Sequence, residues 1–229
     1  MNILAFDTST AACSVALQHD DQVTVLHEIA PKQQANLILS MMKELLHRTS
    51  LTFLELDAIA YGCGPGSFTG VRIASSVAQG IGFVTNCPIV PISSLSAIAQ
   101  TAFEERGWQT LFIALDARVE QLYWAVYEVN SAGYVDLRGE EEIVFPDQIT
   151  IDQITIDQTI TLAKEKIGYG IGEGWEKYEQ KLTKKLGIKP IAIQIIQYPN
   201  AESILKLAKI KLHEGKWVSA PFALPIYLR

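Results

Sequence analysis

Cysteine, long apolar runs and targeting segments are scarce or absent in this sequence. The three cysteines, Cys13, Cys63 and Cys87, are scattered and form no CxxC pair, which indicates a reducing compartment and no disulfide framework. No run of about 18 apolar residues occurs, so we expect no membrane span. The opening residues MNILAFDTST lack the basic region of a signal peptide. These absences together predict a cytoplasmic protein.

Positive charge is also scarce. The 229 residues include 19 Lys and Arg against 25 Asp and Glu, which gives a net charge of −6. Proteins that bind nucleic acid alone usually carry a basic patch, because neutralising phosphates supplies most of the affinity. The lysines between residues 164 and 189 are interleaved with glutamates, and we interpret them as a solvated face. We therefore expect no independent binding of nucleic acid.

Motifs of the common hydrolases and kinases are missing too. The four histidines form no HxxxH or HExxH pair. The glycine-rich stretch YGCGPGSFTGVR, residues 61–72, has neither the spacing nor the lysine of a Walker A phosphate-binding loop. No GxSxG serine motif occurs. The sequence therefore predicts no histidine- or cysteine-based metal site and no catalytic residue of these enzyme classes.

What the sequence does contain is a pattern that occurs twice. An apolar run ends at Asp7, and a second one ends at Asp116, 109 residues later. In both halves a polar turn and two further strand-like segments follow. Tyr61 and Tyr169 each open a glycine-rich stretch, and they lie 108 residues apart. Two landmarks with nearly the same offset indicate an internal repeat.

Helical patterns accompany these strands. Apolar residues at helical spacing predict a helix over residues 33–47. Ser67 or Thr69 can cap a second helix that runs to about residue 83, with a small residue at every fourth position. Asn200 is expected to cap a last helix that ends at a glycine. A three-stranded meander, a crossover helix, a further strand and a glycine turn, all repeated, predict an α/β chain of the actin-like (ASKHA, ribonuclease H-like) fold, with two duplicated lobes that each hold a mixed sheet and helices.

The repeat predicts lobes over residues 1–108 and 109–229, with the last helix free to pack back on the first lobe. Residues 147–161, DQITIDQITIDQTIT, repeat a five-residue unit. This segment is prone to form strands, and we place it at a sheet edge or on a variable loop.

Two acidic residues occupy the positions that carry chemistry in this fold. In catalytic members, the acidic residue after the first strand faces a nucleotide phosphate and its metal ion. The helix start after the first glycine loop can also hold an anion through its free amides. The carboxylates could hold Mg²⁺ across a cleft, or merely cap local turns. The candidate cofactor-binding residues are Asp7, Gly64, Gly66, Ser67, Thr69 and Asp116.

Several segments match one family closely. The stretches ILAFDTSTAACSVAL, DAIAYGCGPGSFTGVRIASSVAQGIGF, PISSLSAIAQ, ALDARVEQLYWAVYE and PIYLR resemble the bacterial TsaB (YeaZ) family. The string GPGSFTGVR at residues 64–72 is the most specific of these matches. The resemblance spans essentially the whole chain and is weakest over residues 140–197.

The resemblance implies a role in making N6-threonylcarbamoyladenosine at position 37 of tRNAs that read ANN codons. It implies a non-catalytic scaffold or activator of the catalytic paralogue TsaD, acting with the ATPase TsaE and touching tRNA only indirectly. No tightly bound cofactor is expected; ATP, ADP or Mg²⁺ would bind only in the assembled complex. The alternatives are a small-molecule kinase of the same fold, which would bind ATP alone, and a metallopeptidase, which would need a tightly held metal.

The resemblance also implies where partners bind. Helices 33–47 and 69–83 would contact TsaD, or a second copy of the chain as a homodimer, through the same face. Gln34 stands where family members often carry a histidine, so a weak metal-binding or hydrogen-bonding role there would be lost. The expected partner-binding residues are Leu37, Ile38, Met41, Met42, Leu45, Arg72, Ala74, Ala78 and Ile81.

Overall fold

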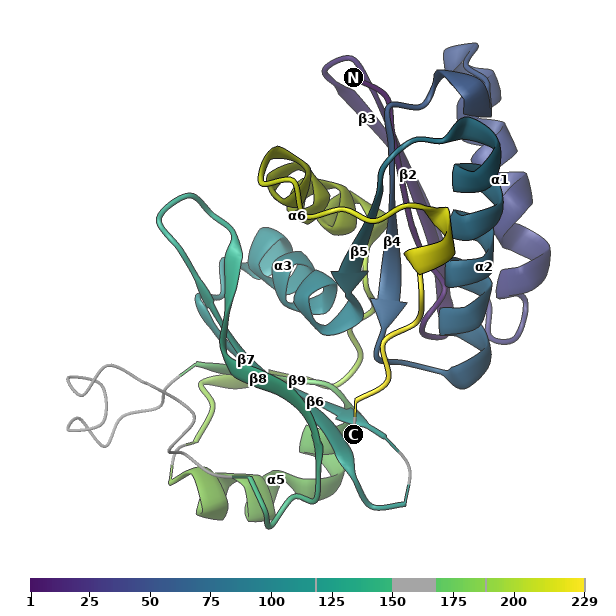
Figure 1. Cartoon of the computed structure of the whole chain (residues 1–229). Coiled ribbons are helices and arrows are strands. Elements are labelled where there is room, and N and C mark those ends of the chain that lie inside the picture. The colour runs from purple at the N-terminus through teal and green to yellow at the C-terminus, as the bar shows by residue number, and fades with distance from the viewer. Residues whose placement is uncertain (118, 150–167, 188, 229) are drawn as a thin grey trace. The chain divides into compact units, whose positions relative to one another are not determined.

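We describe a computed structural model that places residues 1–117, 119–149, 168–187 and 189–228 (Figure 1). The chain divides into two compact units. The first unit holds residues 1–101 and 198–227, and the second holds residues 102–197 with the last two residues. Within the placed residues, no helix is both long and apolar enough to cross a membrane.

The sheet of the first unit begins with an antiparallel meander and continues with two parallel strands. Its strand order is β3-β2-β1-β4-β5. Leu4 and Phe6 join the large apolar side chains on one face, while the alternating Ala5 belongs to the opposite face. Both faces of the central strands are buried, so these strands lack the apolar–polar alternation of an exposed sheet. The strands are β1 (Ile3–Asp7), β2 (Ala12–His19), β3 (Gln22–Ile29), β4 (Ala58–Gly64) and β5 (Ile89–Ser93).

Two helices cover the large-residue face of this sheet. They are α1 (Gln34–Thr49) and α2 (Phe68–Thr85), and both contribute to the same apolar core as β1, β2 and β4. The predicted cap of α2 is confirmed, because the Ser67 hydroxyl accepts a hydrogen bond from the Gly70 amide at 3.1 Å.

The last helix, α6 (Ala201–His213), packs on the other side of the first sheet against β1, β2, β4 and β5. Asn200 caps it, as predicted, by accepting a hydrogen bond from Glu202 N at 2.9 Å. Ala201 N donates to Ser14 Oγ at 2.9 Å, which ties the helix to β2. The observed division therefore differs from a boundary at residues 108–109, because residues 198–227 complete the first unit.

The second unit repeats the sheet of the first. Its strand order, β10-β9-β6-β7-β8, matches the first sheet when read in reverse. Trp175 anchors its core by donating from Nε1 to the Phe112 carbonyl at 2.8 Å. Gly170 must be small, because a Cβ there would lie 2.9 Å from the Trp175 ring. The elements are β6 (Thr110–Asp116), β7 (Leu122–Val129), β8 (Val135–Val144), β9 (Tyr169–Ile171), α5 (Glu173–Leu186) and β10 (Ala192–Gln194). The preceding helix, α3 (Ser94–Arg106), begins in the first unit and ends in the second.

Two five-stranded mixed sheets with the same order confirm both the internal repeat and the actin-like, ribonuclease H-like fold class. The second glycine-rich stretch is a structural turn that starts α5 at Gly172, whose φ of 108° favours glycine. The prediction for residues 147–161 falls mostly on residues 150–167, which lie outside the described part of the chain.

Candidate functional site

The first glycine loop packs directly against the turn that follows β1. Ser67 N donates to the Ser9 carbonyl at 2.7 Å, and the Thr8 hydroxyl donates to the Gly70 carbonyl at 2.7 Å. A Cβ on Gly66 would lie 2.6 Å from the Ser9 carbonyl oxygen, and one on Gly70 would overlap the Thr8 carbonyl. The loop and the turn therefore touch without room for a methyl group between them.

Asp7 is enclosed by the same contacts. Its Oδ1 accepts hydrogen bonds from Ser9 N and Ser9 Oγ, both at 2.8 Å, and its Oδ2 accepts one from Ser94 Oγ at 3.2 Å. Gly62 lies against the carboxylate, and any side chain there would collide with it. Burial raises the pKa of Asp7 to about 6, although the bonds from Ser9 and Ser94 oppose this rise. Asp7 thus stabilises a local turn, the structural alternative that the sequence left open.

Some of the backbone amides at the start of α2, which could otherwise bind an anion, already donate hydrogen bonds within the protein. Two of its amides, those of Ser67 and Gly70, already have protein acceptors. Thr69 is exposed. Gly64 faces the C-terminal segment, since a Cβ there would lie 3.0 Å from the Ile226 carbonyl oxygen. Nucleotide binding by these residues stays a prediction.

Asp116 has a different environment in the second unit. It ends β6, its side chain is 43% exposed, and its Oδ1 lies 3.8 Å from Lys177 Nζ. An exposed pair of this kind contributes little to stability. Across the residues that the structure places, no three His, Cys, Asp or Glu side chains are grouped to share a metal ion.

Six of the nine expected partner-binding residues lie in the core of the first unit. Their helices turn the most apolar stripe toward the sheet of their own unit, so these side chains cannot meet a partner. The small residues on α2 serve the same packing: a Cβ on Gly82 would overlap the Ile89 side chain. The expectation is corrected for these six buried residues: Ile38, Met41, Met42, Leu45, Ala74 and Ala78.

A second apolar stripe on α2 packs at the edge of the core and is not fully buried there. Three of its members are half-buried, and the fourth, Val84, is 68% exposed. Gly80 lies between them, and a Cβ there would have no neighbour within 4 Å. Their spacing of three or four residues is a helical pattern that the sequence contains, but the more apolar, core-facing stripe dominated the prediction. We call this set the outer stripe of α2: Ile73, Val77, Ile81 and Val84.

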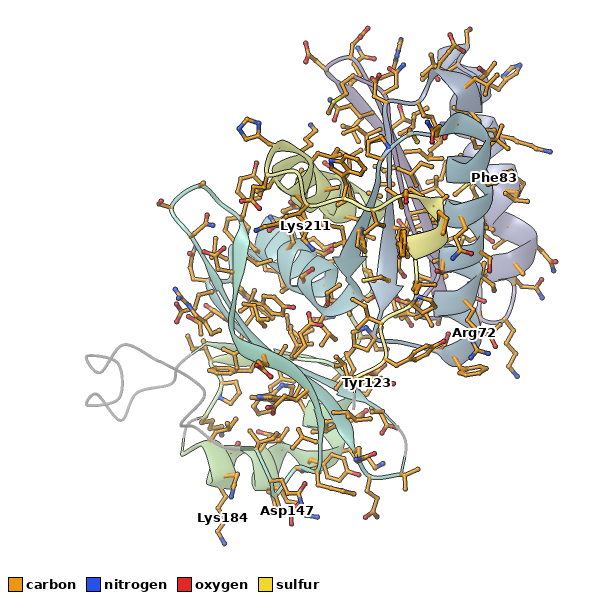
Figure 2. All side chains as sticks on the ribbon, viewed as in Figure 1. Arg72, Phe83, Tyr123, Asp147, Lys184 and Lys211 are labelled. Atoms are coloured by element: carbon orange, nitrogen blue, oxygen red, sulfur yellow. The ribbon has the colours of Figure 1, made fainter. Side chains whose placement is uncertain are left out.

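Of the three remaining expected residues, Ile81 belongs to this stripe, and Leu37 and Arg72 do not. Leu37 is half-buried. Arg72 is exposed at one end of α2, and Phe83, which is 83% exposed, lies at the other end (Figure 2). The Arg72 guanidinium carbon lies 3.4 Å from the centroid of the Phe68 ring, and its Nε donates to the Tyr227 hydroxyl at 3.0 Å. Arg72 therefore joins α2 to the C-terminal segment.

Gln34 retains a hydrogen-bonding role, contrary to the expected loss. Its side chain is buried, and Nε2 donates to the Thr10 carbonyl at 2.6 Å. The start of α1 is thereby tied to the turn that holds Asp7.

Comparison with known proteins gives a consistent result. The family model for TsaD, tRNA N6-adenosine threonylcarbamoyltransferase, matches residues 12–225. The tRNA threonylcarbamoyladenosine biosynthesis protein TsaB of Haemophilus influenzae is 36% identical over 100% of this chain and 94% of its own length. TsaB of Escherichia coli is 36% identical over 100% and 95%.

Solved structures agree with these relatives. YeaZ from Pseudomonas aeruginosa superposes with a TM-score of 0.86 at 35% identity, covering 99% of both chains. An uncharacterised protein with similarity to peptidase YeaZ, also from P. aeruginosa, gives a TM-score of 0.87 at 36% identity over 100% of this chain and 99% of its own. On these full-length matches, the chain belongs to the TsaB family of tRNA threonylcarbamoyladenosine biosynthesis proteins.

Proposed function

We propose that this chain is a non-catalytic subunit that supports threonylcarbamoyl transfer to adenosine 37 of tRNA by binding a TsaD-type transferase. The observation that carries this proposal is the outer stripe of α2. It presents apolar side chains that the unit's own core leaves half-buried or exposed, around the open position Gly80. Glycine at such a position allows another backbone to approach closely.

The apolar area of the outer stripe favours a reversible complex. Fully burying an apolar side chain contributes about 1.5–3 kcal/mol, and half-buried side chains contribute less. Association costs about 4–15 kcal/mol before any net affinity appears. The stripe alone falls short of that cost, so the partner must also cover neighbouring exposed groups such as Phe83.

The closed turn at Asp7 supports the non-catalytic part of the proposal. Both carboxylate oxygens already accept hydrogen bonds within the unit. The glycine loop packs on Thr8 and Ser9 at the place where a phosphate turn would have to open. This arrangement stabilises the lobe and the start of α2.

The same stripe would serve a second copy of the chain, so the homodimer and the TsaD complex should compete. Met41 and Met42 are buried and cannot adapt this surface to different partners. We propose that TsaE completes the assembly and that the partners bind the tRNA, which agrees with the net charge of −6. ATP, ADP or Mg²⁺ would be held tightly only in the assembled complex.

Reconstitution tests this function. Purified TsaD and TsaE would be supplied with threonylcarbamoyl-AMP and an ANN-decoding tRNA, with or without this chain, and the modified adenosine would be measured by mass spectrometry. We expect modification only when the chain is present. Full-rate modification in its absence, or phosphoryl transfer from ATP to a small molecule by the chain alone, would contradict the proposal.

A further inference from the structure

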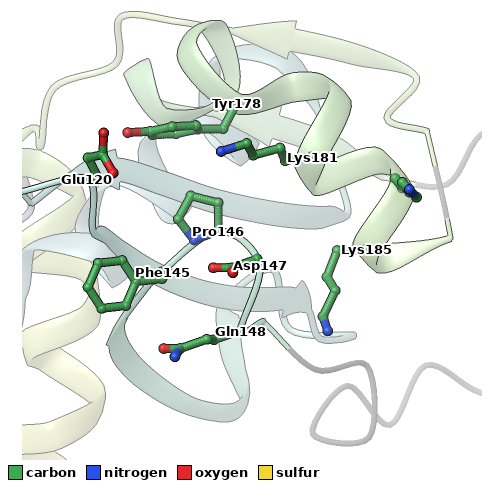
Figure 3. A pocket seen from close by; sticks show the side chains of 9 residues that line it. Glu120, Phe145, Pro146, Asp147, Gln148, Tyr178, Lys181 and Lys185 are labelled. Carbon is green, nitrogen blue, oxygen red and sulfur yellow. The ribbon is translucent and has the colours of Figure 1, made fainter.

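The second unit contains a pocket that the preceding function does not use. It has a volume of about 710 Å³ and lies between α5 and residues 145–148, with Glu120 at its edge (Figure 3). Pockets of roughly 300–1,000 Å³ are the usual size for small-molecule sites. None of the residues of the outer stripe of α2 contributes to it.

One wall of the pocket is cationic. Lys181, Lys184 and Lys185 lie on one face of α5 because of their helical spacing, and all three line the pocket. No carboxylate among the placed residues lies within ion-pair distance of any of the three. Three ammonium groups on one wall outnumber the two carboxylates that line the pocket, Glu120 and Asp147, and this excess favours an anionic ligand.

A buried hydroxyl lines the same pocket, and Figure 3 shows it pointing toward Glu120. It belongs to Tyr178; the side chain is 9% exposed, and its Oη has no hydrogen-bond partner at ordinary distance among the residues that the structure describes. A long hydrogen bond with this hydroxyl raises the pKa of Lys177, whose Nζ lies 5.0 Å from the ring centroid. An ammonium group can only donate, so the Tyr178 proton is left without an acceptor. A buried hydroxyl without a partner is costly, and an acceptor on a ligand would remove that cost.

The other end of the pocket differs in character. Figure 3 shows Phe145 and Glu120 at the end away from Lys185, with Asp147 between the two ends. Phe145 is 37% exposed, so its ring can stack on a planar group. The carboxylates of Glu120 and Asp147 can accept hydrogen bonds from amino or hydroxyl groups. The pocket thus pairs an anion-binding end with an aromatic, acceptor-lined end.

We infer that this pocket binds a phosphorylated small molecule of the mononucleotide class. Lys181, Lys184 and Lys185 hold the phosphate, the base lies toward Phe145, and the Tyr178 hydroxyl, which points toward Glu120, donates to an acceptor on the nucleoside. A polyanion such as RNA fits less well, because α5 also carries Glu173, Glu176 and Glu179 and the whole chain is acidic. The inference is independent of the proposed transferase partner.

Calorimetric titration of the full chain with AMP tests this inference, with adenosine and inorganic phosphate as partial ligands. We expect AMP to bind with a sub-millimolar dissociation constant and each partial ligand to bind at least about tenfold more weakly. The double change Lys184→Gln with Lys185→Gln should weaken AMP binding by about tenfold or more. Lys43→Gln, at an exposed lysine on α1 in the first unit, is the matched control and should leave AMP binding unchanged.

Tyr178→Phe supplies a second readout. Removing a hydroxyl whose proton has no protein acceptor within hydrogen-bond distance should leave the urea midpoint of unfolding unchanged or higher, while weakening AMP binding by about three- to tenfold. Any one of three results would overturn the inference. These are no AMP binding at millimolar concentration, equal affinity for AMP and inorganic phosphate, and displacement of AMP by an RNA oligonucleotide that binds more tightly.

Discussion

Gly70 of α2 lies directly against the carbonyl of Thr8, so that a Cβ at position 70 would overlap that oxygen. The hydroxyl of Thr8 returns a hydrogen bond to the Gly70 carbonyl at 2.7 Å. Through this pair the start of α2 is fixed to the turn after β1. This contact adds to the core packing that holds the rest of α2.

Substitution of Gly70 by alanine should destabilise the first unit. The added methyl must push the helix start away from Thr8, which we expect to lower the free energy of unfolding by about 1–3 kcal/mol. Gly80→Ala is the matched control on the same helix, because its Cβ meets open space. That change should raise the free energy of unfolding by about 0.5–1 kcal/mol. Urea denaturation would measure both, and equal effects would contradict the proposed contact.

The carboxyl group of Asp7 predicts a specific pH dependence. Its pKa is raised from 3.8 to about 6 by burial, so the folded chain keeps this proton to a higher pH than the unfolded chain. This group's contribution to stability is therefore complete below about pH 4 and declines by about 3 kcal/mol as the pH rises through 6.

Asp7→Asn should abolish that decline, because the amide stays neutral. Between pH 4 and pH 7 the free energy of unfolding of the variant, relative to the native chain, should rise by about 3 kcal/mol. Asp21→Asn, an exposed change in the β2–β3 turn, serves as the control and should follow the native profile. A constant difference between Asp7→Asn and the native chain across this range would show that Asp7 is not buried as described.

Arg72 should control the last residues of the first unit. Arg72→Met keeps the apolar stem but removes the hydrogen bond to Tyr227. We expect faster hydrogen exchange at the Ile226 amide, which donates to the Cys63 carbonyl at 2.8 Å, with a global stability change below about 1 kcal/mol. Arg48→Met on α1 is the control. Unchanged exchange at Ile226 would mean that the segment is held without Arg72.

Much of the fold was readable from the sequence because local signals agreed. The repeated run ending in aspartate, the Ser67 cap and the Asn200 cap each correspond to an observed feature. The extent of the first unit was less predictable, since no local pattern says which sheet a terminal helix will cover. The bond from Ala201 N to Ser14 joins residues distant in sequence.

The candidate site was harder to predict than the fold. Helical periodicity identifies the most apolar face of a helix, and that face is normally the one that packs on the helix's own sheet. The family resemblance directed attention to α1 and α2; Met42 was then chosen from the apolar stripe and Ala78 from the line of small residues, and both are fully buried. Substitutions at these two positions would therefore change the stability of the core and would not report on partner binding. The weaker periodicity of Val77 and Val84 marks the stripe that we propose for the partner.

Gly80→Arg tests the central claim most directly. The side chain projects into open space, and replacing glycine within a helix should raise stability by about 0.5–1 kcal/mol, so the folded chain is preserved. Gln180→Arg, at an exposed position on α5, is the matched control. We predict that Gly80→Arg loses binding to TsaD and lowers tRNA modification to the level without this chain, while Gln180→Arg retains both. If Gly80→Arg bound TsaD with native affinity and supported full modification, the outer stripe of α2 would not be the partner-binding surface.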